Sequence, residues 1–475
     1  MRTDRFVLAG ILVSFCIYAS NLTARQTTSP PQMGYIRVIP DNGATSPDGL
    51  AIFGFQNGGN LISEAGMPST STIQSGRLFV EINATVNTGI AFANPSSEDA
   101  TINYYFTDSS GQDFGGGVIT LPANHQTATY LTDAPFSASP FTGTLTFSSS
   151  GGIGAFGWRS RINERSEALM TTVPVSPIGS GFGGTALIIP QFPTGATSAT
   201  QVVLVNPGET PLSGTVRFFG WGPQNPYTEQ VKVVVNGIAG NSFNYTIAPR
   251  SVFEMAAQAA PNSGQVGLVR IDPASGGGSP SSLAIFSYQT GGITVSESGT
   301  AALPASQAVR LFVESAGVFG AIGSIQTGVS ISNPSSSNGV NVQMDLWTLD
   351  GTPTGLTSSI TIPAGGQILK FANDLFPSLP AAFKGVLEIN APSPFVVEAL
   401  RDRYNERSDL LMTTIPVYDD TSLPALQTVF PHFVSGTGYW TQLILLSTGG
   451  PQSGSLTVLS QDGTELPATI FQPNP

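Results

Sequence analysis

Two long internal repeats constrain the fold of this chain more than any other feature. The sequence RLFVE begins at Arg77 and again at Arg310, and the sequence NERS begins at Asn163 and again at Asn405. Further matches between these markers define one repeated unit, unit B. Its two copies span residues 76–176 and 309–418. Self-similarity at a fixed period indicates tandem structural modules, each with the same local fold.

A second unit, unit A, separates the copies of unit B and is complete only at residues 185–304. Its closing half, 283–297, is echoed by residues 50–64, and its opening half, 190–214, is echoed by residues 431–454. The chain therefore begins with the second half of a unit A, at 33–72. It ends with the first half of another, at 428–475.

The two half-units are complementary but incomplete. An isolated half-sandwich would expose an apolar face and unpaired strand edges, which proteins avoid. Three alternatives follow: the halves pair within one chain and close a ring, they exchange head-to-tail between chains, or the ends are loose or the reading frame incomplete. Neither half supplies the stretch equivalent to about 235–266, which corresponds to about two strands.

The units read as all-β. Short segments rich in Val, Ile, Leu, Thr and aromatic residues are punctuated by Gly and Pro, and a helix is expected only as a single turn near 373–376. About seven short strands in a unit of this length predict an immunoglobulin-like β-sandwich. The strands predicted in the second copy of unit B are 328–332, 340–349, 359–362, 367–371, 385–389, 395–400 and 410–415.

With these NERS motifs and the Leu-Ala-Ile-Phe motifs at 50–53 and 283–286, the chain resembles secreted bacterial proteins with tandem immunoglobulin-like β-sandwich repeats. The resemblance covers nearly all of residues 33–475. It implies an extracellular or surface role, and it implies no defined chemistry.

The N-terminus predicts export. Arg2 and Arg5 precede an apolar run over residues 6–19, the pattern of a secretory signal peptide, here residues 1–24. The run is short for a membrane span, although an uncleaved anchor is the alternative. Because Cys16 is the only cysteine, the remaining chain would fold without a disulfide. We therefore expect a secreted or cell-surface protein, bacterial extracellular or periplasmic, with no membrane span after signal cleavage.

Charge excludes some partners. Only 10% of residues are charged, and the net charge is −12. This balance gives no electrostatic footprint for nucleic acid or for an anionic membrane surface.

The most distinctive polar cluster surrounds the two NERS motifs. Alternate arginines place their side chains on one face of a strand, where guanidinium groups hold carboxylates. The cluster is either an ion-paired turn that fixes a junction between modules, with Glu164 and Glu406 as internal partners, or an anion or uronate site. Its members are Arg159, Arg161, Glu164, Arg165, Arg401, Arg403, Glu406 and Arg407.

The sequence contains no motif typical of a catalytic or metal site. His125 and His432 lie in different units without repeated partners and are expected at the surface. There is no nucleophile elbow, zinc spacing or calcium loop. We therefore predict no catalytic residue, no metal and no cofactor.

The expected function is a non-enzymatic structural spacer, adhesin or matrix component. Its partners would be cell-surface or matrix components or glycans, with head-to-tail self-association as a further option. The alternative is a glycan-binding or carbohydrate-active protein with sites in the loops between modules.

Overall fold

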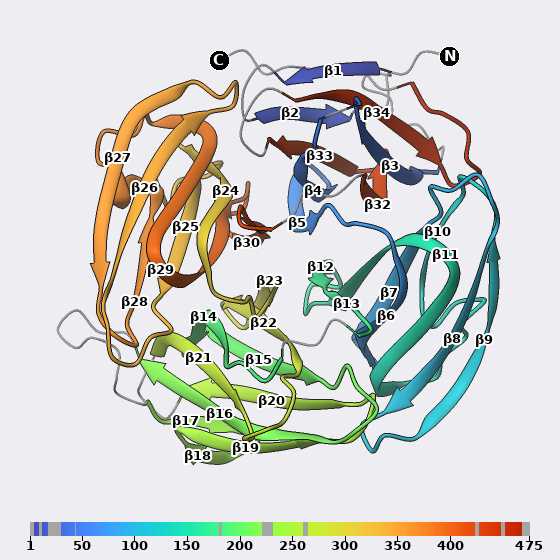
Figure 1. The fold of residues 1–475 in the computed structure, drawn as a ribbon, viewed down its shortest axis with the longest axis horizontal. Coiled ribbons are helices and arrows are strands. Elements are labelled where there is room, and N and C mark those ends of the chain that lie inside the picture. The colour runs from blue at the N-terminus through green and yellow to red at the C-terminus, as the bar shows by residue number, and fades with distance from the viewer. Residues whose placement is uncertain are drawn as a thin grey trace.

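The computed structural model describes residues 4–8, 12–17, 30–42, 44–179, 183–220, 231–259, 265–422, 427–447 and 452–467. Antiparallel sheets make up almost all of it, arranged as β-sandwiches around a ring (Figure 1). The all-β sandwich prediction is confirmed. The single helical turn, α1 (Ala372–Leu375), lies where the sequence predicted one.

The first copy of unit B folds as sandwich B1. Its strands are β6 (Ile73–Ile82), β7 (Val86–Ala93), β8 (Ala100–Asp108), β9 (Asp113–Leu121), β10 (Gln126–Tyr130), β11 (Phe141–Ile162), β12 (Ala168–Val173) and β13 (Val175–Pro177). Strand β11 belongs to both layers, because its first part pairs with β6 and β8 and its last part pairs with β7 and β12.

The second copy folds in the same way as sandwich B2. Its strands are β24 (Ser306–Ala316), β25 (Ile325–Ser332), β26 (Val340–Thr348), β27 (Pro353–Ile362), β28 (Gln367–Phe371), β29 (Ala382–Tyr404), β30 (Leu410–Ile415) and β31 (Val417–Asp419). The strands predicted at 385–389 and 395–400 are one continuous strand, β29. Pro392 and Pro394 lie between the two predicted strands, and the φ angle of proline is compatible with the extended backbone found there.

The complete unit A folds as sandwich A2. Its sheets have the orders β14-β21-β16-β19 and β18-β17-β20-β15-β22-β23. The strands are β14 (Leu187–Thr194), β15 (Ser198–Val205), β16 (Leu212–Gly220), β17 (Val233–Val235), β18 (Ile238–Gly240), β19 (Ser242–Ile247), β20 (Val252–Ala259), β21 (Gln265–Pro273), β22 (Ser281–Thr290) and β23 (Ile293–Ala301).

The two half-units pair with each other in a composite sandwich. From the N-terminal part come β1 (Asp4–Leu8), β2 (Leu12–Ile17), β3 (Gln32–Pro40), β4 (Asp48–Asn57) and β5 (Asn60–Pro68); from the C-terminal part come β32 (Thr428–Ser435), β33 (Tyr439–Leu446) and β34 (Gln452–Ser460). Strand β3 lies between β32 and β34, and β33 pairs with β4. The pairing of half-units therefore occurs within one chain and closes the ring.

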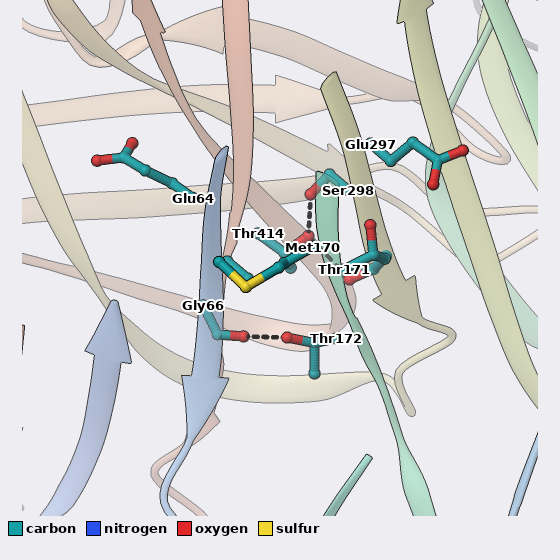
Figure 2. A pocket seen from close by; sticks show the side chains of 10 residues that line it. Glu64, Gly66, Met170, Thr171, Thr172, Glu297, Ser298 and Thr414 are labelled. Carbon is teal, nitrogen blue, oxygen red and sulfur yellow. Dashed lines mark hydrogen bonds between the residues drawn. The ribbon is translucent and has the colours of Figure 1, made fainter. Parts of the chain in front are cut away.

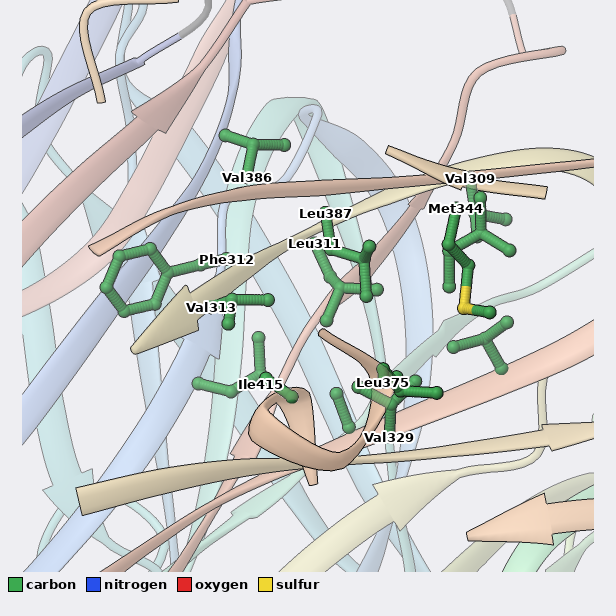
Figure 3. Close-up of a cluster of buried hydrophobic side chains, with 14 of the residues drawn as sticks. Val309, Leu311, Phe312, Val313, Val329, Met344, Leu375, Val386, Leu387 and Ile415 are labelled. Atoms are coloured by element: carbon green, nitrogen blue, oxygen red, sulfur yellow. The ribbon is translucent and has the colours of Figure 1, made fainter. Parts of the chain in front are cut away.

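Apolar packing continues from each sandwich into its neighbour. The B2 core, which Figure 3 shows, includes Leu50 and Ile444 of the composite sandwich. The B1 core likewise includes Leu283 of A2, the A2 core includes Leu400 of B2, and the composite core includes Phe156 of B1. Burial of apolar surface therefore stabilises every junction of the ring and not only the interior of each sandwich.

One strand from each sandwich faces the middle of the ring. These strands are β5, β12, β23 and β30, and they converge in the centre of Figure 1. The NERS turns lie directly before β12 and β30, so the repeated polar cluster is carried to the ring centre twice.

Candidate functional site: the central arginine–carboxylate junction

Each NERS turn is shaped by its own asparagine. The Asn163 Oδ1 atom accepts the backbone N–H groups of Arg165 and Glu167, each at 2.9 Å, and Ser166 closes the turn with a φ of 60°. Asparagine side chains form such turns readily because they replace a backbone acceptor two residues away. The second turn repeats this arrangement around Asn405.

The same turns attach to the neighbouring unit A. Asn163 Nδ2 donates to the Thr294 carbonyl at 2.9 Å, and the Glu164 carboxylate accepts the Thr294 N–H at 2.6 Å. In the other half of the ring, Asn405 and Glu406 make the equivalent pair of bonds to Leu61, both at 2.8 Å. Each turn therefore extends the edge of an inner A strand by side-chain hydrogen bonds.

The alternate arginines hold carboxylates from two other strands. Arg159 donates Nε to Glu81 at 3.0 Å and Nη1 to Glu297, while Arg161 reaches the second oxygen of Glu297 at 3.2 Å. Arg159 is only 3% exposed. Burial alone would lower the pKa of its guanidinium, but Glu297 and Glu81 outweigh burial and raise it. Arg159 is therefore charged and fully engaged.

The second copy reproduces this network. Arg401 donates Nε to Glu314 at 2.7 Å and Nη1 to Glu64 at 2.5 Å, and Arg403 reaches Glu64 at 3.3 Å. Burial would raise the pKa of Glu314, but Arg401 and Lys384 lower it below its ordinary value. Each network thus joins one B sandwich to one inner A strand through buried ion pairs.

Two reciprocal ion pairs cross the ring between the B sandwiches. Arg165 of B1 lies 2.6 Å from the Asp409 carboxylate of B2, and Arg407 of B2 lies 2.7 Å from Glu167 of B1. The ion-paired residues therefore repeat with a pseudo-two-fold arrangement. All eight residues predicted as a cluster lie in this junction, four in each half.

The inner strands themselves approach closely, as Figure 2 shows. Thr172 Oγ1 donates to the Gly66 carbonyl at 2.6 Å, a bond that Figure 2 marks. In the other half of the ring, Thr414 Oγ1 donates to the Gly299 carbonyl at 2.9 Å. The gap between these strands is too small to admit a water molecule. The centre is therefore a packed junction of backbones and not an open channel.

The sequence missed the principal partners of the arginines. Glu164 and Glu406 were expected as their carboxylates, but each sits 4.0 Å from Arg161 or Arg403 and mainly binds backbone. The main partners are the glutamates of the two RLFVE motifs and of the two Ser-Glu pairs in unit A. Their repetition in step with the arginines was the available signal, and the partners are Glu81, Glu314, Glu64 and Glu297.

The arginines that open the RLFVE motifs make the outer contacts of the same strands. Arg77 donates to the carbonyl of Asn206 in A2 at 2.9 Å, and Arg310 donates to the carbonyl of Ser447 in the composite sandwich. Both side chains are buried. The motif therefore joins its B sandwich to one unit A at the outer edge and to the central network at the inner edge.

The histidines do not join the junction. His125 binds its own loop through the Ala123 carbonyl. His432 was expected at the surface, but it is partly buried, and its ring stacks on Trp158 with centroids 5.8 Å apart. Among the described residues, no group of three or more histidines, cysteines or acids is placed to hold a metal ion. Within the same residues, no helix has the length and apolar character of a bilayer-spanning segment.

Comparison with known proteins gives no family. No family model and no curated protein matches the chain. The GH78 family rhamnosidase of Bacillus sp. GL1 is similar at a TM-score of 0.14 and 9% identity, over 83% of this chain and 55% of that chain. This chain thus spans about half the length of that enzyme. The infectious bursal disease virus Gt strain structure gives 0.11 and 8%, over 97% and 88% of the two chains. TM-scores this low support no argument about activity.

Proposed function

We propose that this protein is a non-enzymatic, secreted or cell-surface scaffold, acting as a structural spacer, adhesin or matrix component. The observation that carries the proposal is the central junction. Its buried arginines are neutralised by carboxylates of the same chain, as in Arg401 between Glu314 and Glu64. Charged residues so engaged fix the relative positions of sandwiches, whereas a catalytic or anion site presents its charges to a ligand.

The ring geometry narrows the kind of scaffold. Because the half-units pair within one chain, the sandwiches form a closed body and not an extended string. A closed body fixes the loops at its periphery relative to one another, and loops on a rigid scaffold are the common carriers of recognition. This favours an adhesive or matrix role over that of a long flexible spacer.

The test combines location and binding. We expect the chain in the extracellular or surface fraction of its own cells, and we expect the purified ring to bind cells or matrix. A double variant Arg159→Met/Arg161→Met should lower stability without changing that binding when measured below its unfolding temperature. Reproducible turnover in a hydrolase screen, abolished by one Asp or Glu substitution, would refute the non-enzymatic proposal.

A second candidate function is glycan binding, which one observation supports. A hollow of about 400 Å³ lies between the loop at 333–339 and strand β29 of B2. Hydroxyl, amide and proline groups line it, which is a surface on which a neutral sugar could bind. A glycan array would test it, with Ser393→Trp to fill the hollow and Ser150→Trp, at an exposed position of B1, as the control. Array signals that both variants retain would rule the hollow out. The lining includes Asn333, Pro334, Ser335, Asn338, Ser393 and Pro394.

A further inference from the structure

The composite sandwich has the same strand order as A2. In A2 the first sheet runs β14-β21-β16-β19, and in the composite sandwich it runs β32-β3-β34-β1. In the second sheet, β20-β15-β22-β23 of A2 corresponds to β2-β33-β4-β5. Strands β1 and β2 therefore occupy the places of β19 and β20. These two strands are the ones that neither half-unit supplies.

The first sheet is also paired at equivalent acceptor positions. Gly214 of A2 pairs with Tyr245, and the equivalent Gly454 pairs with Phe6. Two residues earlier in each strand, Leu212 pairs with Ile247, and Gln452 pairs with Leu8. The donor strands therefore pair along equivalent stretches of β16 and β34.

The second sheet is likewise paired at equivalent acceptor positions. Thr200 pairs with Ala257 in A2, and the equivalent Thr441 pairs with Ile17. At the other end of these strands, Val205 pairs with Val252, and Leu446 pairs with Leu12. Strands β1 and β2 thus take the places of both missing strands, in the same order and along equivalent acceptor residues.

The acceptor strands need such a donor. Strand β34 has β3 on its other side, and β33 has β4, so both would be sheet edges without β1 and β2. Their residues Leu443, Leu445, Leu456 and Val458 are buried in the composite core. Open edges beside an apolar core invite pairing with other chains and aggregation.

We propose that residues 4–8 and 12–17 are the strand donors that complete the composite sandwich, and that the folded protein keeps them. The proposal rests on strand order and on the acceptor residues that are paired, and it bears on the proposed function because it reassigns the segment from which export is predicted. It competes with the predicted removal of residues 1–24, because processing at that point would leave the edges of β33 and β34 open. The proposal thus assigns these N-terminal strands to the folded protein, whereas the signal-peptide prediction has them removed.

Hydrogen exchange on the full chain tests the proposal directly. We expect the amides of residues 12–17 that bond to β33 to exchange about 100-fold or more slowly than those of a free peptide, as ladder amides do. Exchange of the whole segment at free-peptide rates in the folded chain would overturn the proposal. This readout requires no variant and therefore does not depend on whether a variant folds.

A matched pair of proline variants adds a second test. Successive amides of a strand point to opposite sides, so Val13→Pro/Ser14→Pro removes at least one donor to β33. The equivalent change in A2 is Phe253→Pro/Glu254→Pro. These two residues pair with the β15 residues that are equivalent to the β33 partners of Val13 and Ser14. We expect both variants to lower the unfolding temperature and to accelerate exchange in the acceptor strand. An effect in A2 with none at residues 441–446 would overturn the proposal.

The mass of the protein recovered from its own cells provides the third measurement. A chain that retains residues 4–17 supports the proposal. A chain that begins after residue 17, with the same unfolding temperature as the full chain, would overturn it. Localisation and binding assays test the proposed function separately, so the two proposals can fail independently.

Discussion

Arg165 lies 2.6 Å from the carboxylate of Asp409, although 244 residues separate them in the chain. Arg407 and Glu167 make the reciprocal contact across 240 residues. These pairs join the two B sandwiches directly, whereas most other junctions join a B sandwich to a unit A. The ring is therefore held together at its centre as well as around its circumference.

Loss of a buried central arginine should be strongly destabilising. Arg159→Met leaves Glu297 and Glu81 in the interior without their main counter-charge, and breaking such a buried pair costs about 3–5 kcal/mol. We expect the same from Arg401→Met. The control is Arg217→Met, which removes a 40% exposed partner of Asp272 and should cost about 1 kcal/mol or less. Urea denaturation measures all three, and equal losses would contradict the special role of the centre.

The cross-ring pair should contribute modestly. Arg165 is 32% exposed, so solvent screens its attraction to Asp409. A double-mutant cycle with Arg165→Met and Asp409→Asn should give a coupling of about 0.5–1 kcal/mol that decreases as salt is added. The cycle for Arg407 and Glu167 should give a similar value. A coupling that does not respond to salt would contradict the exposed geometry.

The close approach of the inner strands makes one glycine critical. A Cβ added to Gly66 would lie 2.2 Å from the Thr414 carbonyl oxygen, which is backbone and cannot swing aside. Gly66→Ala should therefore lower the free energy of unfolding by about 1–3 kcal/mol through overpacking. Gly151→Ala is the control, because nothing lies within 4 Å of its added Cβ. Thermal unfolding of both variants checks the prediction, and equal melting temperatures would contradict it.

A buried carboxyl should make the A2–B2 junction sensitive to alkaline pH. Glu398 is 2% exposed and shares a sheet face with Ser330, Ser332 and Gln367. Burial raises its pKa from 4.5 to about 8, and the backbone amide of Gln191 opposes the shift only in part. Between these values the unfolded chain is ionised while the folded chain holds the proton. Stability therefore falls as pH rises from about 4.5 to 8.

Substitution of that carboxyl tests the prediction. Glu398→Gln keeps the shape and removes the titration, so the gain in melting temperature over the parent should be larger at pH 8 than at pH 5. Burial also raises the pKa of Asp402 to about 7, which leaves a residual slope in the same direction. Adding Asp402→Asn to Glu398→Gln should remove the remaining dependence of stability on pH in this range. A variant that melts in parallel with the parent at every pH would contradict the assignment.

The equivalent junction between B1 and the composite sandwich should respond to acid. Burial lowers the pKa of His432 from 6.5 to about 4, so the folded state keeps the ring neutral while the unfolded state takes up a proton. Stability is therefore lost as pH falls from about 6.5 to 4. His432→Gln introduces the residue that A2 has at the equivalent position, Gln191. The variant should lose less stability than the parent as pH falls from about 6.5 to 4. Melting curves over that range measure it, and an unchanged slope would rule out His432 as the cause.

Much of the secondary structure could be predicted from local sequence patterns. The strand predicted at 410–415 has the same bounds in the structure, because β-branched and apolar residues alternate between defined turns. The single helical turn also lies where it was predicted. The sequence divided strand β29 wrongly into 385–389 and 395–400, and its pairing with strands of both sheets shows that the backbone remains extended between them.

The candidate site was only partly accessible from sequence. Alternation placed Arg159 and Arg161 on one face of a strand, and the repeat showed that Arg401 and Arg403 would share that geometry. Their partners could not be assigned, because Glu297 and Glu64 lie more than 130 residues away in the chain. No local pattern states which distant carboxylate a guanidinium will meet.

The sequence by itself determined the repeat, the all-β class and the complementarity of the two half-units, since these follow from short-range patterns of apolar residues, glycine and proline. Tertiary structure alone decided that β5, β12, β23 and β30 meet at the centre, that residues 4–8 pair with β34 and that residues 12–17 pair with β33. The physical reason is that packing and strand register depend on the three-dimensional arrangement of segments that lie far apart in the chain.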